Sequence, residues 1–295
     1  MNKVLCVGAA VVDFVFHLET LPDKAEKYGT ESAAIVGGGC AANSAVAVSR
    51  LGGEAILGAR LGDDPIGDLV IAGLAGDNVD TSNVTRTPGA RSSYSSVFID
   101  QRGERQIVNF RGQGLVLDTS WFDSVQNLGA VLTDTRRVSA ARDALMLAQQ
   151  RGIPGILDGE APVDPNLVAL ASHAAFSLQG LRDLVPGTTP QEALTKLRAE
   201  HGCWVCVTDG ENGVWFTDQD NMRHVPAFEV DPVDTLGAGD VWHGAFALAL
   251  CEGQSELNAI RFANAAAALK CTKSGGREGA PTRSETEQFL KEKTT

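Results

Sequence analysis

Residues 233–240 read Val-Asp-Thr-Leu-Gly-Ala-Gly-Asp, and an apolar run over residues 241–250 follows at once. The two glycines and the alanine allow a tight turn, and the run has the length and composition of a buried helix. The stretch therefore predicts a loop that leads into a helix N-terminus, where unpaired N–H groups and the helix dipole bind anions. Asp240 places a carboxylate beside that anion site. This suits an enzyme that takes a proton from a hydroxyl attacking a phosphoryl group; alternatively, Asp240 only stabilises the helix dipole.

The segments before this loop alternate between strand and helix patterns. Strands are predicted at residues 3–10, 130–133, 153–158, 173–177 and 203–208, and the clearest helices at residues 139–151 and 190–201. This alternation predicts a largely parallel sheet with helices on both faces. Ligands gather at the carboxyl ends of such strands, where Asp13, Asp158 and residues 208–213 fall. For Asp13, an ordinary turn or capping role is an equal alternative.

Two β-rich stretches interrupt the alternation, at about residues 14–36 and 92–112. The second contains two apolar-alternating runs, residues 94–100 and 105–110, joined by a turn at residues 101–104, which is the pattern of a hairpin. Together the two stretches predict a small sheet that stands apart from the main one. Such a sheet covers a pocket, pairs with a second copy, or does both.

A glycine triplet, Gly37 to Gly39, opens a predicted helix of small residues that Gly52 closes. Glycines at a helix start let the backbone approach a ligand, and small residues let the helix pack closely on the sheet. Both interpretations remain open from the triplet alone.

Composition limits the possible partners. The 295 residues suffice for one large α/β domain, and the formal net charge of -12 argues against general affinity for nucleic acid or an anionic membrane. An anionic substrate must therefore be met by local donors. No apolar run is long enough to span a membrane, and the first residues read as a strand rather than a signal peptide, so we expect a cytoplasmic protein.

The six cysteines do not predict a metal site. Four are scattered singly among small apolar residues, which is typical of reduced, buried thiols. Cys203 and Cys206 have the spacing of metal ligands, but no second pair exists and they fall in a predicted strand. We expect no structural zinc.

Taken together, five motifs strongly resemble the ribokinase-like (PfkB) sugar kinases, in the right order and over essentially the whole chain. They are Gly37-Gly38-Gly39 with Asn43, the helix end at Leu51-Gly52, Gly62-Asp63-Asp64 with Gly67, Thr208-Asp209-Gly210 with Gly213, and Asp234-Thr235 with Gly237-Ala238-Gly239-Asp240. The resemblance implies a single domain over residues 1–295 with a Rossmann-like ribokinase α/β fold: a mostly parallel central sheet with helices on both faces, and a small β-sheet lid from residues 14–36 and 92–112. It also implies ATP-dependent phosphorylation of a sugar hydroxyl.

The same resemblance implies roles for individual residues. Asp240 matches the catalytic base, and Gly237, Ala238 and Gly239 match the anion hole for the transferring phosphoryl group. The sugar-contacting positions are matched by Asp13, Gly38, Gly39 and Asn43. The nucleotide side is matched by Thr208, Gly210 and Gly213, with Asn264, Ala268 and Gly276 near the adenine. Asp234 and Thr235 match positions that in many relatives help to hold a monovalent cation, so K⁺ is a further expected cofactor.

The chain departs from the family at one place. Many members carry an Asn-x-x-Glu motif that organises Mg²⁺ through waters, and the matching stretch here is Ser177-Leu178-Gln179-Gly180. Mg²⁺ remains an expected cofactor beside ATP. It must then be held through phosphates and other carboxylates, for which Asp158 and Glu160 are candidates, and we assign no protein ligand to it.

A narrower resemblance rests on six segments: Lys27-Tyr28, Gly103-Glu104-Arg105 with Ile107 and Asn109, Leu157-Asp158-Gly159, His173 to Ser177, Pro226-Ala227-Phe228, and Ala268 to Thr272. Within the family they most resemble the sulfofructose kinases, which phosphorylate 6-deoxy-6-sulfofructose at its 1-hydroxyl. A sulfonate needs several fixed N–H donors. Lys27 and Asn109 on the two insertions would supply them together with Arg136, for which Arg137 is a substitute; alternatively, these are solvated surface residues. Other possible functions are a fructokinase, a 6-phosphofructokinase or another sugar kinase, and a sugar-binding regulator without catalysis. We also expect a homodimer formed through the β lid.

Overall fold

A nine-stranded sheet forms the centre of the computed structural model, which describes residues 2–219 and 221–294. Its strand order is β13-β12-β11-β10-β9-β8-β1-β4-β5, and only β12 and β13 run antiparallel to their neighbours. The strands are β1 (Lys3–Gly8), β4 (Glu54–Gly62), β5 (Thr85–Thr87), β8 (Ala130–Asp134), β9 (Gly155–Gly159), β10 (His173–Ser177), β11 (Trp204–Thr208), β12 (Val214–Asp218) and β13 (Asn221–Val225).

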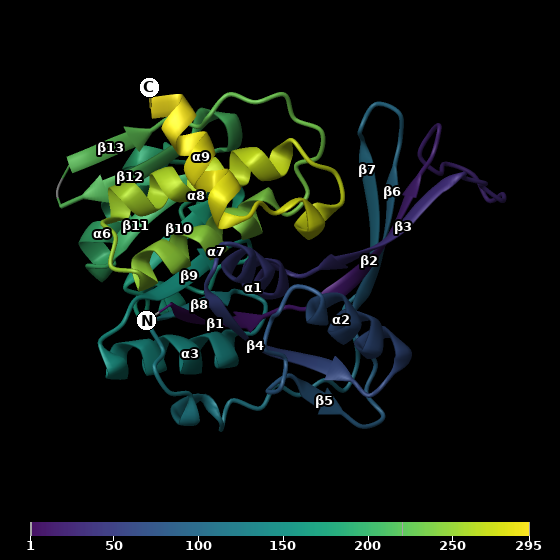
Figure 1. Cartoon of the computed structure of the whole chain (residues 1–295), viewed down its shortest axis with the longest axis horizontal. Helices are drawn as coiled ribbons and strands as arrows, with labels where there is room; N and C mark the ends of the chain where they lie inside the picture. The colour runs from purple at the N-terminus through teal and green to yellow at the C-terminus, as the bar shows by residue number, and fades with distance from the viewer. Residues whose placement is uncertain (1, 220, 295) are drawn as a thin grey trace.

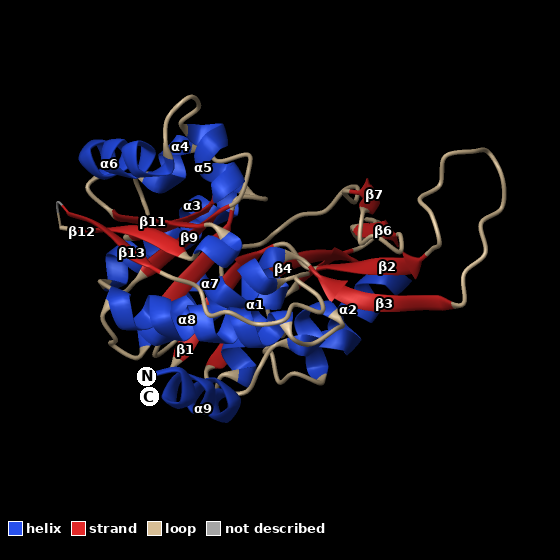
Figure 2. Ribbon diagram, turned by 90° about the horizontal axis from the view of Figure 1, so that it is seen from above, coloured by secondary structure: helices blue, strands red, loops and turns tan. Residues whose placement is uncertain are grey.

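Helices cover both faces of this sheet. On one face lie α1, α7 and α8, with α9 packed outside α8; on the other lie α3 to α6 (Figure 2). The helices are α1 (Cys40–Arg50), α2 (Pro65–Ala75), α3 (Val138–Arg151), α4 (Pro165–Val168), α5 (Leu178–Leu184), α6 (Pro190–His201), α7 (Ala238–Cys251), α8 (Glu256–Cys271) and α9 (Arg283–Thr294), with short 3₁₀ turns at η1 (Phe122–Ser124), η2 (Gly210–Asn212) and η3 (Gly276–Gly279). The predicted mostly parallel α/β fold is confirmed.

Small side chains bring α1 and α7 unusually close together. Residues 41–48 of α1 and 241–250 of α7 are all buried. At Gly244 a Cβ atom would lie 2.5 Å from the carbonyl oxygen of Ser44, so this crossing tolerates no side chain there. The alanine-rich α8 packs against α7 in the same layer. Helices α1 and α8 therefore hold the start of α7 in a fixed place against the sheet.

A separate four-stranded sheet projects from the main body (Figure 1). Its strand order is β3-β2-β6-β7, from β2 (Val11–His17), β3 (Ser32–Gly38), β6 (Tyr94–Ile99) and β7 (Arg105–Phe110). Both β-rich stretches of the sequence contribute, although β2 begins and β3 ends a few residues outside the range 14–36. The long connection between β2 and β3, which carries Lys27, reaches away from the molecule (Figure 2).

The glycine-rich segment after α8 is partly buried. Residues 274–281 contain η3, in which Gly276 and Arg277 are buried. Within the described residues, no helix combines the length and the apolar character that crossing a membrane requires.

Candidate active site

Two helix N-termini meet at the carboxyl edge of the main sheet. Gly237 precedes α7 with φ of 76° and Gly39 precedes α1 with φ of 94°, both in the left-handed region that favours glycine. Neither helix start has a side-chain cap. In α1, Ala42 N already donates to the Ala9 carbonyl at 3.1 Å, and in α7 Ala238 N donates to the Thr235 carbonyl at 3.2 Å. The N–H groups of Gly239 and Asp240 are therefore the ones that α7 offers to a ligand. The predicted anion-binding loop, residues 237–240, thus lies where an anion would receive backbone hydrogen bonds.

Asp240 sits in the first turn of α7 and is held by α1. The Asn43 side chain donates a hydrogen bond from Nδ2 to Asp240 Oδ2 at 2.7 Å, and Ser44 Oγ donates to the backbone carbonyl of Asp240 at 2.9 Å. Burial, together with the charge of Asp158 and against the Asn43 hydrogen bond, raises the pKa of Asp240 to about 7. A carboxylate with a pKa near neutrality is suited to accept a proton from a hydroxyl.

Buried carboxylates surround this residue. Asp158 ends β9, and burial, with the nearby Asp134 and Glu160 charges, raises its pKa well above the usual range. Its Oδ1 atom is buried and has no hydrogen-bond partner among the described residues, and His243 Nε2 lies 3.5 Å away while also facing the Ala175 carbonyl at 3.2 Å. An orphaned buried oxygen of this kind needs a cation or a water.

The carboxylates fit a divalent cation. Ligand atoms of Cys40, Asp158 and Asp240 lie within 4.8 Å of one another, and two of the three are carboxylate oxygens, which Mg²⁺ prefers. Glu160, the other candidate, is 40% exposed and faces Arg136 at 3.9 Å. Gly180 stands where many family members have the Glu of the Asn-x-x-Glu motif. A side chain cannot fit there, because a Cβ at Gly180 would collide with the carbonyl oxygen of Gly159. With no room for a side chain at this position, Asp158 is the residue that would hold Mg²⁺.

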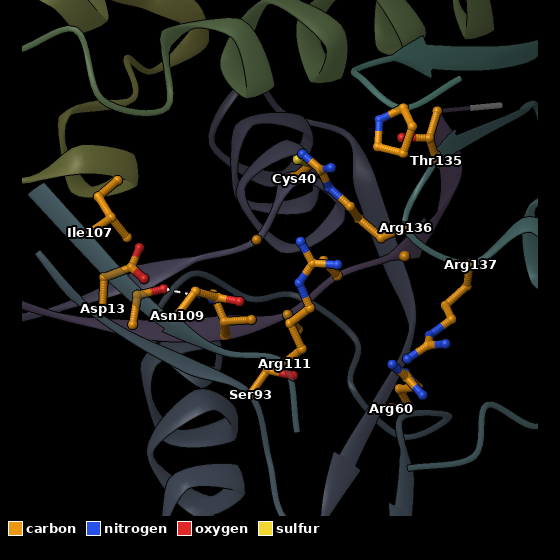
Figure 3. A pocket seen from close by; sticks show the side chains of 17 residues that line it. Asp13, Cys40, Arg60, Ser93, Ile107, Asn109, Arg111, Thr135, Arg136 and Arg137 are labelled. Atoms are coloured by element: carbon orange, nitrogen blue, oxygen red, sulfur yellow. Dashed lines mark hydrogen bonds between the residues drawn. The ribbon is translucent and has the colours of Figure 1, made fainter. Parts of the chain in front are cut away.

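A cavity of about 710 Å³ opens beside Asp240, between the main sheet and the small sheet. Asp13, Gly39, Asn109 and Arg136, all predicted sugar-contacting residues, line it (Figure 3). Asn109 Nδ2 donates to Ser95 Oγ at 3.0 Å. Gly38 lies behind Asp13, where a Cβ would stand 2.5 Å from Asp13 Oδ2. Cys40 lines the cavity as well, and so connects it to Asp158 and Asp240.

Four arginines line this same cavity. In Figure 3 the guanidinium groups of Arg60 and Arg137 face each other, whereas that of Arg136 points toward Cys40; Arg111 is the fourth. Arg60 Nη1 donates to the Leu115 carbonyl at 2.8 Å, and Arg136 Nη1 donates to the Ala161 carbonyl at 2.9 Å. In the described part of the chain, only Arg136 among the four has a carboxylate within 4.0 Å. The cavity therefore carries positive charge that the protein itself does not neutralise.

The sequence identified this cluster only in part. Arg136 and Arg137 were recognised because they follow a strand, whereas Arg60 lies inside β4 and Arg111 directly after β7, where no motif marked them. Lys27 was expected at the cavity, but it lies exposed on the β2–β3 connection and does not line it. The expectation for Lys27 is not met within this chain, because the long connection carries it away from the main sheet.

The predicted nucleotide residues lie around β11, α8 and η3. Thr208 ends β11 and donates from Oγ1 to the Phe176 carbonyl at 3.3 Å, and Gly210 starts η2. Asn264 is engaged at both ends, since it accepts from Trp242 Nε1 at 2.8 Å and donates to the Pro226 carbonyl at 3.1 Å. The Asn264 side chain thus links α8 to α7 and to the segment after β13, and both of its polar ends are already hydrogen-bonded instead of free to bind adenine. The remaining predicted residues, Gly213, Ala268 and Gly276, are buried.

The expected monovalent-cation position holds a side chain. Lys270 Nζ donates to the Asp234 carbonyl at 2.7 Å and lies 3.3 Å from Asp234 Oδ2. The other Asp234 contacts are two backbone donors, Leu236 N at 2.9 Å and Gly276 N at 3.0 Å, and the Arg105 guanidinium group at 3.8 Å. The side chain of Thr235, the other expected residue, makes no hydrogen bond among the described residues. The oxygens of Asp234 are therefore already paired with an ammonium group, and they do not fit an added K⁺.

Comparison with known proteins agrees with this geometry. Residues 1–283 match the family described as pfkB family carbohydrate kinase. The ribokinase of Bacillus subtilis is 29% identical over 98% of this chain and 100% of its own length. A crystal structure of a candidate ribokinase from Agrobacterium tumefaciens is 38% identical with a TM-score of 0.92, covering 99% of this chain and 98% of that one. Arabidopsis thaliana ribokinase, solved with ribose and ATP, is 26% identical with a TM-score of 0.87 and 98% coverage of both chains.

The chain belongs to the pfkB family of carbohydrate kinases. It is an ATP-dependent phosphotransferase whose acceptor is a sugar. A sugar-binding regulator without catalysis, one of the functions considered from the sequence, is thereby set aside.

Proposed function

We propose that this kinase phosphorylates an acidic ketohexose, 6-deoxy-6-sulfofructose, at its 1-hydroxyl to give 6-deoxy-6-sulfofructose 1-phosphate. The observation that carries the proposal is the set of four arginines in the sugar cavity, Arg60, Arg111, Arg136 and Arg137. Among the described residues, only Arg136 of the four has a carboxylate within 4.0 Å, and in a chain of net charge -12 such a concentration of positive charge favours an anionic substrate. A neutral sugar has no group that would offset the mutual repulsion of these guanidinium groups.

A sulfonate suits this cluster chemically. It offers three acceptor oxygens and one negative charge, and guanidinium groups bind such oxygens with paired N–H donors. Asn109 lies on the small sheet side of the same cavity. The proposal therefore keeps Asn109 and Arg136 as sulfonate contacts, adds Arg60, Arg111 and Arg137, and gives Lys27 no role within its own protomer.

The opposite end of the site carries the chemistry. Asp13 and Asn43 hold sugar hydroxyls, Asn43 through an Oδ1 atom that is buried and otherwise unpartnered in the described residues. Asp240 accepts the proton of the attacking hydroxyl, and the N–H groups at the start of α7 stabilise charge on the phosphoryl group as it moves. Mg²⁺, held at Asp158, would neutralise phosphate charge. The small sheet acts as a lid that excludes water from the reaction.

The second candidate is a 6-phosphofructokinase, which the same arginines favour because a phosphate has the same three-oxygen geometry. A phosphate carries more charge than a sulfonate near neutral pH. Fructose itself, the substrate of a fructokinase, leaves the arginines without a partner. The order of preference among these three sugars therefore decides between the proposals.

A coupled assay of ADP release tests the proposal with sulfofructose, fructose, fructose 6-phosphate, tagatose 6-phosphate and ribose. We expect the highest kcat/KM with sulfofructose. Substituting Arg137→Gln removes one charged contact, which predicts a KM for sulfofructose raised about ten-fold or more and an unchanged KM for fructose. Arg142→Gln on the exposed part of α3 is the matched control and leaves both values unchanged. A wild-type enzyme that prefers fructose or ribose would contradict the proposal.

A further inference from the structure

Lys270 is a fully buried lysine, with no exposed surface. Lysine is almost never buried completely unless its charge is paired, because removing an ammonium group from water is costly. It lies in the last turn of α8, two residues after the predicted adenine-side residue Ala268. Its side chain therefore has a specific partner that compensates for the loss of water.

The partners are three oxygen atoms, two from Asp234 and one from Lys273. Lys270 Nζ lies 2.7 Å from the backbone oxygen of Asp234, 3.3 Å from Asp234 Oδ2, and 3.5 Å from the backbone oxygen of Lys273. The ammonium group is thus surrounded by one carboxylate and two carbonyl groups. Oxygen ligands of this kind are also what a bare monovalent or divalent cation of hard character receives in a protein.

Asp234 in turn accepts hydrogen bonds from the backbone next to the anion-binding loop. Its Oδ1 accepts from Leu236 N, one residue before the Gly237 that starts α7, and its Oδ2 accepts from Gly276 N at the start of η3. Arg105 of the small sheet lies 3.8 Å from Asp234 Oδ1. The Lys270 charge thereby fixes the backbone that presents the α7 amides, and it does so without touching the substrate.

We propose that the Lys270 ammonium group is a built-in replacement for the monovalent cation at Asp234, so that the anion hole is organised without K⁺. An ammonium group and K⁺ carry the same single charge, and a K⁺ ion placed beside Lys270 would be repelled by it. Lys270 is therefore a positioning residue. The inference rests on the phosphotransferase activity and not on the choice of sugar, so a different substrate preference would leave it unaffected.

The first test uses the unmodified enzyme, with its best sugar substrate. Its kcat and KM for ATP are measured in tetramethylammonium chloride, NaCl and KCl at equal ionic strength. The proposal expects the same values in all three salts, and it expects KCl to leave the melting temperature unchanged relative to tetramethylammonium chloride. Activation or specific stabilisation of the wild-type enzyme by K⁺ would overturn the proposal, whatever any variant does.

The second test removes the ammonium group by Lys270→Met, which keeps the length of the side chain. In tetramethylammonium chloride we expect kcat/KM for ATP to fall about ten-fold, the usual effect of losing a charged hydrogen bond. K⁺, which can now enter, should restore a large part of the activity and raise the melting temperature of this variant alone. Lys196→Met, at an exposed lysine of α6, is the control and stays insensitive to K⁺.

A loss of activity in Lys270→Met that K⁺ does not restore would show a purely structural role and overturn the proposal, as would unchanged activity. If Lys270→Met does not fold, Lys270→Gln keeps two N–H donors without the charge and is assayed in the same way. Direct binding of Tl⁺, followed by its NMR signal, gives a readout that does not depend on turnover: the variant should bind it at one site that the wild-type enzyme lacks.

Discussion

At the scale of single residues, the state of Asp240 is set by neighbours on other elements. Burial and the Asp158 carboxylate raise its pKa, while the hydrogen bond from Asn43 fixes Oδ2. In the mechanism that we propose, the second carboxylate oxygen takes a proton from a substrate hydroxyl. A pKa of about 7 leaves this carboxylate partly ionised near neutral pH, as a base that accepts a proton readily.

This predicts the pH dependence of the reaction. Because only ionised Asp240 can act as a base, kcat/KM should fall as the pH drops through about 7, instead of near the pKa of about 4 that an ordinary aspartate has. The measurement is a profile of kcat/KM against pH at saturating ATP. As a control, Asp240→Asn should bind ATP normally while its kcat falls about 10²- to 10⁴-fold at every pH. A wild-type profile that stays flat down to pH values near the ordinary aspartate pKa would contradict this assignment.

At the scale of elements, the crossing of α1 and α7 sets the geometry of the site. Asn43 and Ser44 of α1 hold Asp240 of α7, and Gly244 permits the two backbones to approach. The small residues inside these helices are needed for this approach, and only Cys40 at the start of α1 lines the cavity among the described residues of the two helices. The close packing and the position of the base therefore depend on the same crossing.

Substituting Gly244→Ala tests this dependence. The added methyl group meets the backbone of α1, so we expect the free energy of unfolding to fall by about 1–3 kcal/mol, the usual cost of overpacking. Because α1 must move away from α7, kcat should fall as well. Gly76→Ala is the control, because this C-cap residue of α2 has right-handed helical dihedral angles and open space around it; its substitution should change neither quantity appreciably. Chemical denaturation and steady-state kinetics measure both; a stable variant with full activity would argue against the role of the crossing.

At the scale of the whole molecule, the small sheet exposes apolar side chains where a single protomer has nothing to cover them. Ile35 and Val108 are 55% and 63% exposed, and the strand register places them on the same face of this sheet. Ile107, which is 58% exposed, lies on the other face and lines the sugar cavity. An exposed sheet with such side chains favours pairing with a second copy. This is why we expect a homodimer in which the small sheets of two protomers pack together.

Sedimentation analysis checks this expectation. The wild-type protein should sediment as a dimer. The double substitution Ile35→Lys with Val108→Lys should shift it to a monomer, because two buried charges at the interface are not paired. Met146→Lys changes an equally apolar, 41% exposed residue on α3 and should leave the dimer intact. A wild-type protein that remains monomeric at all concentrations would rule out this use of the sheet.

Much of the fold and part of the site could be predicted from local pattern. The alternation of strands and helices gave the parallel sheet, and the residues 233–240 gave the helix N-terminus with its carboxylate. The arginine cluster was found only in part, because Arg60 lies in β4 and Arg111 directly after β7, far along the chain from Arg136 and Arg137. No spacing in the sequence connects these positions.

The sequence by itself determined the local features: turn glycines, the apolar runs, and the order of motifs that marks the kinase family. These depend on periodicity and backbone conformation, which neighbouring residues fix. Only the tertiary structure decided which charges meet. It placed Lys270 against Asp234, 36 residues earlier, and left Lys27 outside the cavity. Electrostatic partners depend on distance in space, which the chain sets only when its helices and strands have packed.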